Sequence, residues 1–158
     1  MYVCAMYLTH PIAFGQYQIR FATGLYALAY LDPSLCLPLA LANALSNVLF
    51  GGLGAADIVG GFFAGLFTTL GVALFRGLAV PKWFSLVPVA VIPSVMAPIW
   101  LSGLLDVPYW VLVPSILFGQ LVSAFTVGVI VLKSGMLQKA RAALLGIGET
   151  SGGGNLEH

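Results

Sequence analysis

Long apolar runs, broken by short clusters of glycine, proline and charge, make up most of the chain. The run GGFFAGLFTTLGVALF contains no charged residue and does not alternate apolar with polar positions. Inside a bilayer the backbone must satisfy its own hydrogen bonds, so a spanning chain forms helices or a closed barrel, and barrel strands alternate apolar and polar side chains. The continuous runs therefore predict an all-α bundle of membrane helices.

The breaks divide residues 1–137 into six apolar segments that form one membrane domain. The predicted helices are 1–10, 18–31, 34–50, 57–75, 83–105 and 108–132. The first is short and covers only about half of a hydrocarbon core roughly 30 Å thick. Either the chain begins late, or this helix is truncated or reaches that depth only by packing on others. Prolines inside the segments are expected to kink the helices rather than end them, because neighbouring helices can satisfy the freed backbone groups: Pro38, Pro88, Pro93, Pro98 and Pro114.

The composition identifies the solvent around these helices. Sixty per cent of the 158 residues are hydrophobic and 7% are charged, with a mean hydropathy of +1.03. An ordinary soluble domain is about one quarter charged, so the chain is predicted to be an integral membrane protein. The near-neutral net charge argues against nucleic acid as a partner. Two cysteines without metal-ligand spacing predict neither a disulfide framework nor a metal site, and no cofactor is implied.

Lysine and arginine positions predict the orientation. Arg76 and Lys82 flank the connection between the fourth and fifth segments, and Lys133, Lys139 and Arg141 follow the sixth. Because cytoplasmic loops carry an excess of basic residues, we expect both regions and both termini in the cytoplasm. The tail of residues 138–158 is cytoplasmic on this interpretation, and its final Leu-Glu-His resembles the remnant of a purification tag.

The stretch FGQYQIRF holds the only basic residue in the first 75 positions, Arg20, on the predicted outer face. One interpretation is that this arginine snorkels to the lipid headgroups. The other is that it serves a site on the outer face, either by pairing with Asp57 or by fixing a gating loop. That predicted loop consists of Gln16, Tyr17, Gln18 and Arg20.

Other polar residues converge on the same end of the bundle. Asn43, Ser46 and Asn47 share one helical stripe at positions i, i+3 and i+4, and Gln120 with Ser123 forms a second i, i+3 pair. An unpaired amide in hydrocarbon is costly, so each amide must face a partner or a cavity. Hydrogen bonds between helices are one interpretation of these amides, and a ligand pocket that opens outward is the other.

Aromatic residues lie at the same end. Tyr109 and Trp110 begin the sixth segment, and Trp100 lies near the end of the fifth. They form either an ordinary interfacial belt or part of the pocket. Aromatic rings together with amides suit a flat, polar, largely uncharged heterocycle, because rings stack on its faces while amides read its donor and acceptor edges.

Two further patterns limit the function. Gly61 and Gly65 form a GxxxG, which lets helices approach closely, either within the chain or at a docking face. His10 and the cysteines show no nucleophile-and-base arrangement, and no GxxxxGK[ST] occurs. We therefore expect no catalytic residue. A six-helix chain without an internal repeat is small for an alternating-access transporter, so transport would need another subunit to supply energy.

Three blocks, AFGQYQIRF, LANALSNVLFGGLGAADIVGGFFAGL and VPYWVLVPSILFGQLV, resemble the substrate-binding S components of energy-coupling factor (ECF) transporters, in particular the queuosine-precursor family, QueT. Members of that family read roughly FG-x-IQFR-x-SEAL in the first loop and second helix. An Asn-bearing third helix, a Gly-x-x-D-I-x-x-G entry to the fourth and a [FY]W entry to the sixth follow, with a later Gly-Glu. The likeness covers about residues 11–137.

The resemblance implies a six-helix S-component fold in a prokaryotic plasma membrane, with a vitamin-like ligand held near the outer surface. It also implies loading onto a transmembrane coupling protein with two cytoplasmic ATPase subunits, which would hydrolyse the ATP. By position, Asn47, Asp57, Trp110 and Gln120 would line or frame the pocket, with Arg20 in the gating region. Asn43, Tyr109 and Ser123 join them on the pattern of polar and aromatic residues alone.

Two positions depart from the family pattern: Thr23 stands in place of the Glu of SEAL, and Gln120 in place of the later Glu. The loss of two carboxylates removes the natural partners of a cationic aminomethyl group, and an unpaired charge in a low dielectric is costly. The predicted ligand is therefore a neutral 7-deazaguanine-type base or related nucleobase. Two alternatives stay open: an S component for a different vitamin, and a non-transporting membrane subunit that only scaffolds its partners.

Overall fold

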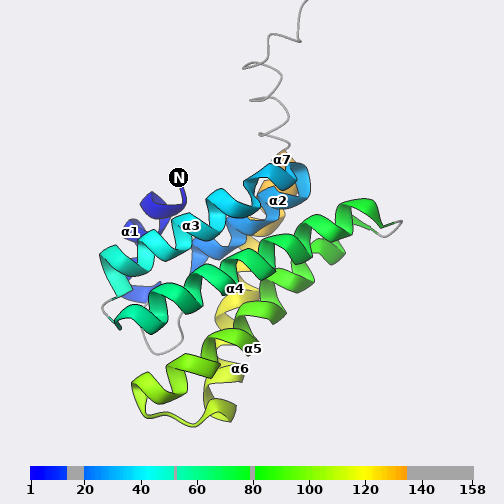
Figure 1. Cartoon of the computed structure of the whole chain (residues 1–158). Helices are drawn as coiled ribbons and strands as arrows, with labels where there is room; N and C mark the ends of the chain where they lie inside the picture. The colour runs from blue at the N-terminus through cyan, green and yellow to red at the C-terminus, as the bar shows by residue number, and fades with distance from the viewer. Residues whose placement is uncertain (14–19, 52, 79–80, 135–158) are drawn as a thin grey trace, which may run out of the picture.

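The computed structural model describes residues 1–13, 20–51, 53–78 and 81–134, and the regular structure within these ranges is helical (Figure 1). The predicted all-α class is confirmed for this part of the chain. Gln16, Tyr17 and Gln18 of the predicted gating loop lie outside the described residues, and so does the predicted tail of residues 138–158.

Helices occupy all six predicted segments, with boundaries that agree within a few residues. In chain order they are α1 (Tyr2–Ala13), η1 (Phe21–Ala27) with α2 (Leu28–Leu31), η2 (Pro33–Leu35) with α3 (Cys36–Ser46) and η3 (Asn47–Gly51), α4 (Ala55–Leu74) with η4 (Phe75–Gly77), η5 (Lys82–Ser85) with α5 (Leu86–Leu105), and α6 (Tyr109–Ser123) with η6 (Ala124–Gly128) and α7 (Val129–Ser134). Of the irregular turns, η3 and η6 are π-helical and the others are 3₁₀.

Within the described residues, four segments are long and apolar enough to cross a membrane by length and composition: Pro33–Gly51, Ala55–Gly77, Lys82–Leu105 and Tyr109–Ser134. The apolar helix Phe21–Leu31 is shorter, and α1 has only 12 residues, which confirms that the first helix is short. The prediction of six transmembrane helices is thus supported in a coarser form, as a helical membrane bundle with four candidate spans and two shorter helices.

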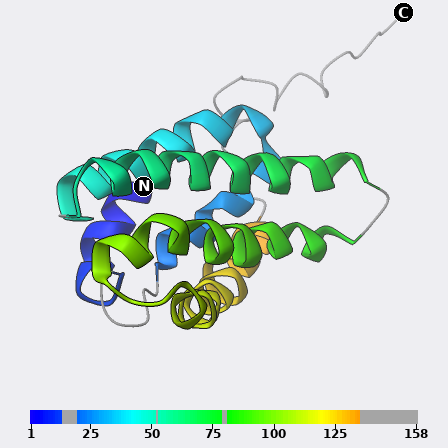
Figure 2. The same cartoon turned by 60° about the horizontal axis from the view of Figure 1, so that its bottom comes forward.

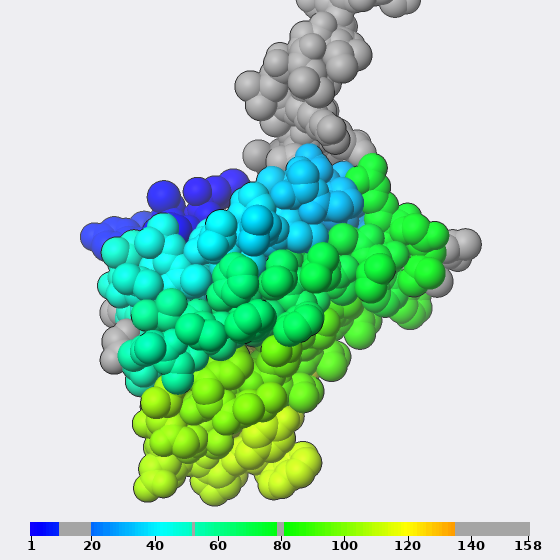
Figure 3. Space-filling model, viewed as in Figure 1, coloured from blue at the N-terminus to red at the C-terminus, as the bar shows by residue number. Residues whose placement is uncertain are grey.

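Proline does not end the helices. Pro93 and Pro98 lie inside α5, and Pro114 lies inside α6, as the sequence predicts. Helix α5 ends instead at Asp106, whose left-handed backbone (φ 53°) closes the helix and leads into the turn before α6. The α5–α6 pair therefore forms a continuous antiparallel hairpin that extends beyond the other helices at one end (Figures 1 and 3).

The short helix η1–α2 lies between α4, α5 and α6 rather than against lipid (Figure 2). Every residue of η1 after the first is buried. Gly24 lets η1 pack closely against α6, because a Cβ at this position would lie 2.7 Å from the Ser123 carbonyl oxygen. At the other end of the helix, Arg76 donates to the Leu31 carbonyl oxygen at 3.1 Å. Because other helices surround this segment and supply its partners, its length does not have to match the bilayer.

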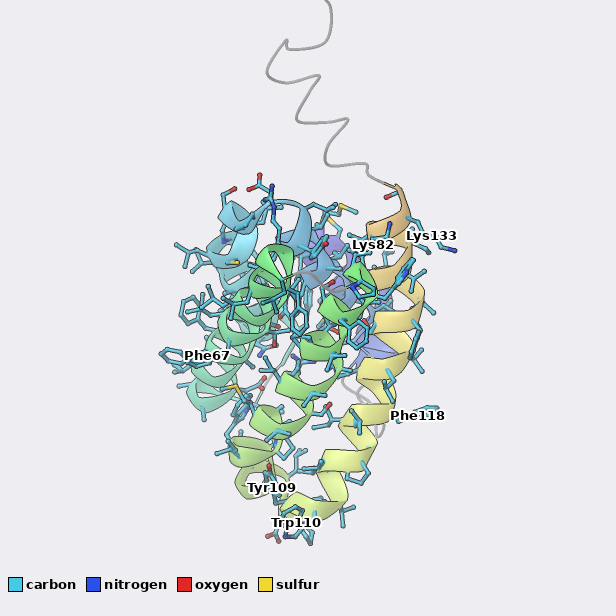
Figure 4. All side chains as sticks on the ribbon, turned by 90° about the vertical axis from the view of Figure 1, so that its right-hand side faces the viewer. Phe67, Lys82, Tyr109, Trp110, Phe118 and Lys133 are labelled. Carbon is cyan, nitrogen blue, oxygen red and sulfur yellow. The ribbon has the colours of Figure 1, made fainter. Side chains whose placement is uncertain are left out.

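Large apolar side chains cover the outside of the bundle and polar ones lie inside. Phe67 on α4 and Phe118 on α6 project outward on opposite sides in Figure 4, with 49% and 58% of their surface exposed. Thr68 and Thr69, which follow Phe67 on α4, are buried, and their hydroxyls donate to carbonyl oxygens one turn earlier. This inside-out distribution is the one that a hydrocarbon solvent requires.

Candidate ligand-binding site

A small cavity lined by both polar and apolar residues lies where η1 meets the four long helices. Its volume is about 30 Å³, which is room for roughly two water molecules. Residues from η1 and its preceding turn, α3, α4, α5 and α6 surround it: Arg20, Thr23, Tyr26, Asn43, Asp57, Gly61, Ala64, Gly65, Pro93, Ala97, Trp100, Leu101, Ile116 and Gln120.

The cavity lies toward one end of the bundle. Asp57 is in the first turn of α4 and Trp100 is near the end of the antiparallel α5. Lys82 and Lys133 lie at the opposite end, as Figure 4 shows, and Tyr109 and Trp110 lie at the cavity's end. Lys82 and Lys133 are therefore separated from the cavity, whereas the basic residue Arg20 lines it. The assignment of the lysine end to the cytoplasm remains a prediction.

On one wall, η1 and α6 are joined through a cluster of hydroxyl and amide groups. The Thr23 hydroxyl lies 2.6 Å from Gln120 Oε1, 2.7 Å from the Arg20 carbonyl oxygen and 3.1 Å from Ser123 Oγ. Its single proton is shared among these acceptors. Ser123 Oγ accepts from the Gly24 amide at 2.8 Å and donates to the Phe21 carbonyl oxygen at 3.1 Å. The close packing at Gly24 brings these groups within reach of one another.

On the opposite wall, Asn43 connects three helices. Its Nδ2 donates to the Gly61 carbonyl oxygen at 2.7 Å, and its Oδ1 accepts from the Tyr2 hydroxyl at 3.1 Å. Tyr2 also lies 3.2 Å from the Tyr26 hydroxyl, with the two rings stacked 5.6 Å apart. Through these contacts α1 packs against the wall of the cavity although it is short.

Asp57 is held between α3 and α5. Asn47 Nδ2 donates to its backbone carbonyl oxygen at 2.8 Å, and the Trp100 indole nitrogen donates to Oδ1 at 3.2 Å. The other carboxylate oxygen, Oδ2, is buried and has no hydrogen-bond partner in the described part of the chain. The carboxylate therefore keeps an acceptor within the cavity wall.

Two consecutive glycines on α4 make these contacts possible. A Cβ on Gly60 would lie 2.5 Å from the Trp100 ring, and one on Gly61 would overlap the Asn47 amide. Successive helical residues point about 100° apart. Gly60 therefore makes room for Trp100 of α5, and Gly61 makes room for the Asn47 side chain that follows α3. A Cβ on Gly65 would likewise lie 3.0 Å from the Tyr26 hydroxyl and 3.3 Å from the Cα of Ala40 in α3. The GxxxG pattern thus serves packing within the chain.

Arg20 and Asp57 are the charged residues among those lining the cavity. A side-chain donor that contacts the Asp57 carboxylate is Trp100 Nε1, at 3.2 Å from Oδ1. The formal charges of Arg20 and Asp57 cancel, so the cavity as a whole is neutral. Arg20 thus lies at the cavity, and its service to a binding site, the second interpretation of its position, remains a prediction.

The structure gathers most of the predicted site residues around this cavity. Asn43, Asp57, Gln120 and Arg20 line it. Asn47 and Ser123 are buried beside it and hold its walls through hydrogen bonds. Their role in binding a ligand remains a prediction.

The two aromatic residues at the start of α6 are not part of the cavity. Trp110 is 81% exposed and stacks edge-on against Tyr109, whose hydroxyl donates to the Val95 carbonyl oxygen at 3.0 Å. Both lie at the protruding tip of the α5–α6 hairpin (Figure 4), where η1 and α4 no longer reach. Their placement agrees with an interfacial belt, and their predicted contact with a ligand remains a prediction.

Of the aromatic residues at this end of the bundle, Trp100 near the end of α5 lines the cavity. Tyr26 and Thr23 are further lining residues that the pattern of amides did not predict as ligand contacts. Gly60 could have indicated Trp100 from the sequence, because a glycine that faces a neighbouring helix leaves space for a large ring. Nothing in the local pattern indicates Tyr26, because its neighbours Tyr2 and Gly65 come from α1 and α4.

The fold and the cavity define an all-helical membrane protein with a partly polar, charge-balanced interior site near one end. The family model described as QueT transporter matches residues 1–136 of the 158-residue chain. The chain belongs to the QueT transporter family, which confirms the resemblance found in its sequence and makes it a membrane protein of a transporter family. No curated protein and no solved structure matches it.

Proposed function

We propose that this chain is the substrate-binding S component of an ECF-type importer in a prokaryotic plasma membrane. It captures a neutral queuosine precursor or related 7-deazaguanine-type base on the outer face. It passes the ligand to a transmembrane coupling protein, whose two ATPase subunits hydrolyse ATP, so this chain is not itself an enzyme. The family membership and a partly polar cavity at the end opposite Lys82 and Lys133 support the proposal.

The neutrality of the cavity is the observation that carries the choice of ligand. The two positions at which the family pattern has glutamate, Thr23 and Gln120, lie side by side and are hydrogen-bonded to each other. Arg20 and Asp57 contribute opposite charges. A neutral base leaves this balance intact, whereas a cationic amine would add an uncompensated charge to a poorly solvated site.

The size of the cavity implies that it widens when a ligand binds. About 30 Å³ is far less than a bicyclic base occupies. The backbone of α4 is tied to α3 through Asn43 and Asn47, so we expect the cavity to widen on the side of α5 and α6, whose lining residues include Trp100 and Gln120. Binding should therefore alter the environment of Trp100.

Calorimetry with the purified protein tests the proposal. We expect the nitrile precursor (7-cyano-7-deazaguanine) to bind more tightly than the aminomethyl precursor (7-aminomethyl-7-deazaguanine). Tighter binding of the amine contradicts the neutral-ligand proposal. Mass spectrometry of co-purified ligand tests the remaining possibilities: an unrelated vitamin indicates a different S component. No ligand, together with no binding in a screen of vitamins and nucleobases, indicates a scaffold subunit.

A further inference from the structure

The Asp57 carboxylate has one unsatisfied oxygen in the cavity wall. The residue is 2% exposed and lines the cavity, yet Oδ2 has no hydrogen-bond partner within the described chain. A buried acceptor left without a donor is destabilising, more so when it is charged. Such a group in a site calls for a donor from outside the chain.

The surrounding contacts fix the orientation of this carboxylate. Trp100 Nε1 donates to Oδ1 at 3.2 Å and holds one oxygen, while the ring packs closely against Gly60. Asn47 Nδ2 donates to the Asp57 carbonyl oxygen at 2.8 Å. This contact also settles the Asn47 amide, since the opposite orientation would bring two carbonyl oxygens together. Asn47 is thus a positioning residue for the start of α4.

What remains open to a ligand is an edge that only accepts hydrogen bonds. Oδ2 has its full accepting capacity, and Oδ1 retains one lone pair beside the Trp100 contact. Two parallel N–H donors on a planar ring match the two oxygens of a carboxylate in a bidentate arrangement. The Trp100 ring, adjacent to the carboxylate, offers a face on which such a planar ring can stack.

We propose that Asp57 determines specificity by binding an edge with two adjacent N–H donors, as a ring amide N–H and its neighbouring exocyclic amino group present in a 2-amino-4-oxopyrimidine ring. This inference rests on the proposed function, and it specifies which edge of the ligand the protein binds. It gives Asp57 a role in distinguishing guanine-like bases from hypoxanthine-like and adenine-like bases.

Three bases with the same ring system test the assignment on the wild-type protein. 7-Deazaguanine has both donors, 7-deazahypoxanthine lacks the amino group, and 7-deazaadenine has an acceptor in place of the ring N–H. Calorimetry should show that 7-deazaguanine binds roughly ten- to a hundredfold more tightly than 7-deazahypoxanthine, the effect of one hydrogen bond to a charged group. 7-Deazaadenine should bind more weakly still.

The variant Asp57→Asn provides the second arm. It keeps the size of the side chain and an oxygen for Trp100 but replaces one acceptor with a donor. We expect it to reduce the preference for 7-deazaguanine over 7-deazahypoxanthine to less than about threefold, on the same scale. Ser46→Ala, whose hydroxyl bonds within its own helix at 2.8 Å, is the matched control and should keep the full preference.

The outcomes separate the two proposals. If 7-deazaguanine and 7-deazahypoxanthine bind equally to the wild-type protein, or if Asp57→Asn keeps the preference, the role of Asp57 is wrong while the proposed function stands. If none of the three bases binds to folded wild-type protein, the proposed function fails and this inference with it. The wild-type comparison alone decides the matter if Asp57→Asn does not fold.

Discussion

Thr23 Oγ1 and Gln120 Oε1 are hydrogen-bonded at 2.6 Å although the two residues are 97 positions apart in the chain. These are the two positions at which the sequence departs from the glutamates of the family pattern. Two carboxylates this close would repel each other unless they shared a proton or a cation. The hydroxyl and the amide instead satisfy each other without charge. The two departures therefore belong to one local arrangement.

Gln120→Glu should shift the ligand preference toward an amine. Glutamate has nearly the same shape, and its oxygen can still accept from Thr23. It adds one negative charge to a cavity in which Arg20 and Asp57 already cancel, so a cationic ligand would then restore neutrality. We expect the affinity ratio of the aminomethyl to the nitrile precursor to rise roughly tenfold or more, equivalent to about 1.4 kcal/mol, by calorimetry.

Thr23→Val is the matched control for that experiment. It removes the hydroxyl without adding charge, so stability should fall by about 1 kcal/mol for the lost hydrogen bonding, with the amine-to-nitrile ratio unchanged. An unchanged ratio in Gln120→Glu would show that Gln120 does not face the ligand.

Asn43→Ala should destabilise the fold more than Ser46→Ala, a substitution on the same face of α3. Asn43 bonds to both α1 and α4, and its loss leaves the buried Tyr2 hydroxyl with one partner fewer, a cost of about 1–3 kcal/mol. Ser46→Ala removes only a hydrogen bond within its own helix and should change little. Apparent unfolding midpoints in detergent provide the measurement; equal midpoints would contradict a linking role for Asn43.

Gly24→Ala should disrupt the packing of η1 on α6 and η6. The added Cβ would lie 2.7 Å from the Ser123 carbonyl oxygen and from the Val127 Cβ, and 2.9 Å from the Gly128 nitrogen. The contact atoms are mainly backbone and cannot move away cheaply, so we expect a loss of about 1–3 kcal/mol. Gly103→Ala, with no atom within 4 Å of the added Cβ, should leave the midpoint unchanged or raise it slightly.

The sequence predicted the helices well because each depends on local information. Continuous apolar runs, ended by glycine, proline and charge, predicted six helical segments, and the observed boundaries differ by only a few residues. What it did not predict is that η1–α2 lies within the bundle. Burial of that helix depends on Gly24 facing Ser123, a contact between distant segments that no periodicity encodes.

In the site too, the features that depend on local sequence were predicted, and those that depend on packing between helices were not. The i, i+3 and i+4 spacing placed Asn43 and Asn47 on one buried face, because helical geometry alone dictates it. The choice between Trp100 and Trp110 depends on how far each helix extends past its neighbours. Trp110 follows the turn at Asp106 and lies at the protruding tip of the hairpin, whereas Trp100 lies earlier in α5 at the level of Gly60. Both residues satisfy the same interfacial pattern, so only the packing distinguishes them.

Ligand binding should be visible in the fluorescence of Trp100 alone. The chain has three tryptophans; Trp83 and Trp110 are 42% and 81% exposed and lie outside the cavity, which Trp100 lines. In the double variant Trp83→Phe and Trp110→Phe, the cavity must widen around Trp100 to admit a bicyclic base, so we expect a saturable change in emission with the same affinity as calorimetry. Gly60→Ala, whose Cβ would overlap the Trp100 ring, should displace that ring and weaken binding about tenfold, the effect of losing about 1.4 kcal/mol. A response that persists in Trp100→Phe and is absent from the double variant would place the ligand elsewhere in the bundle.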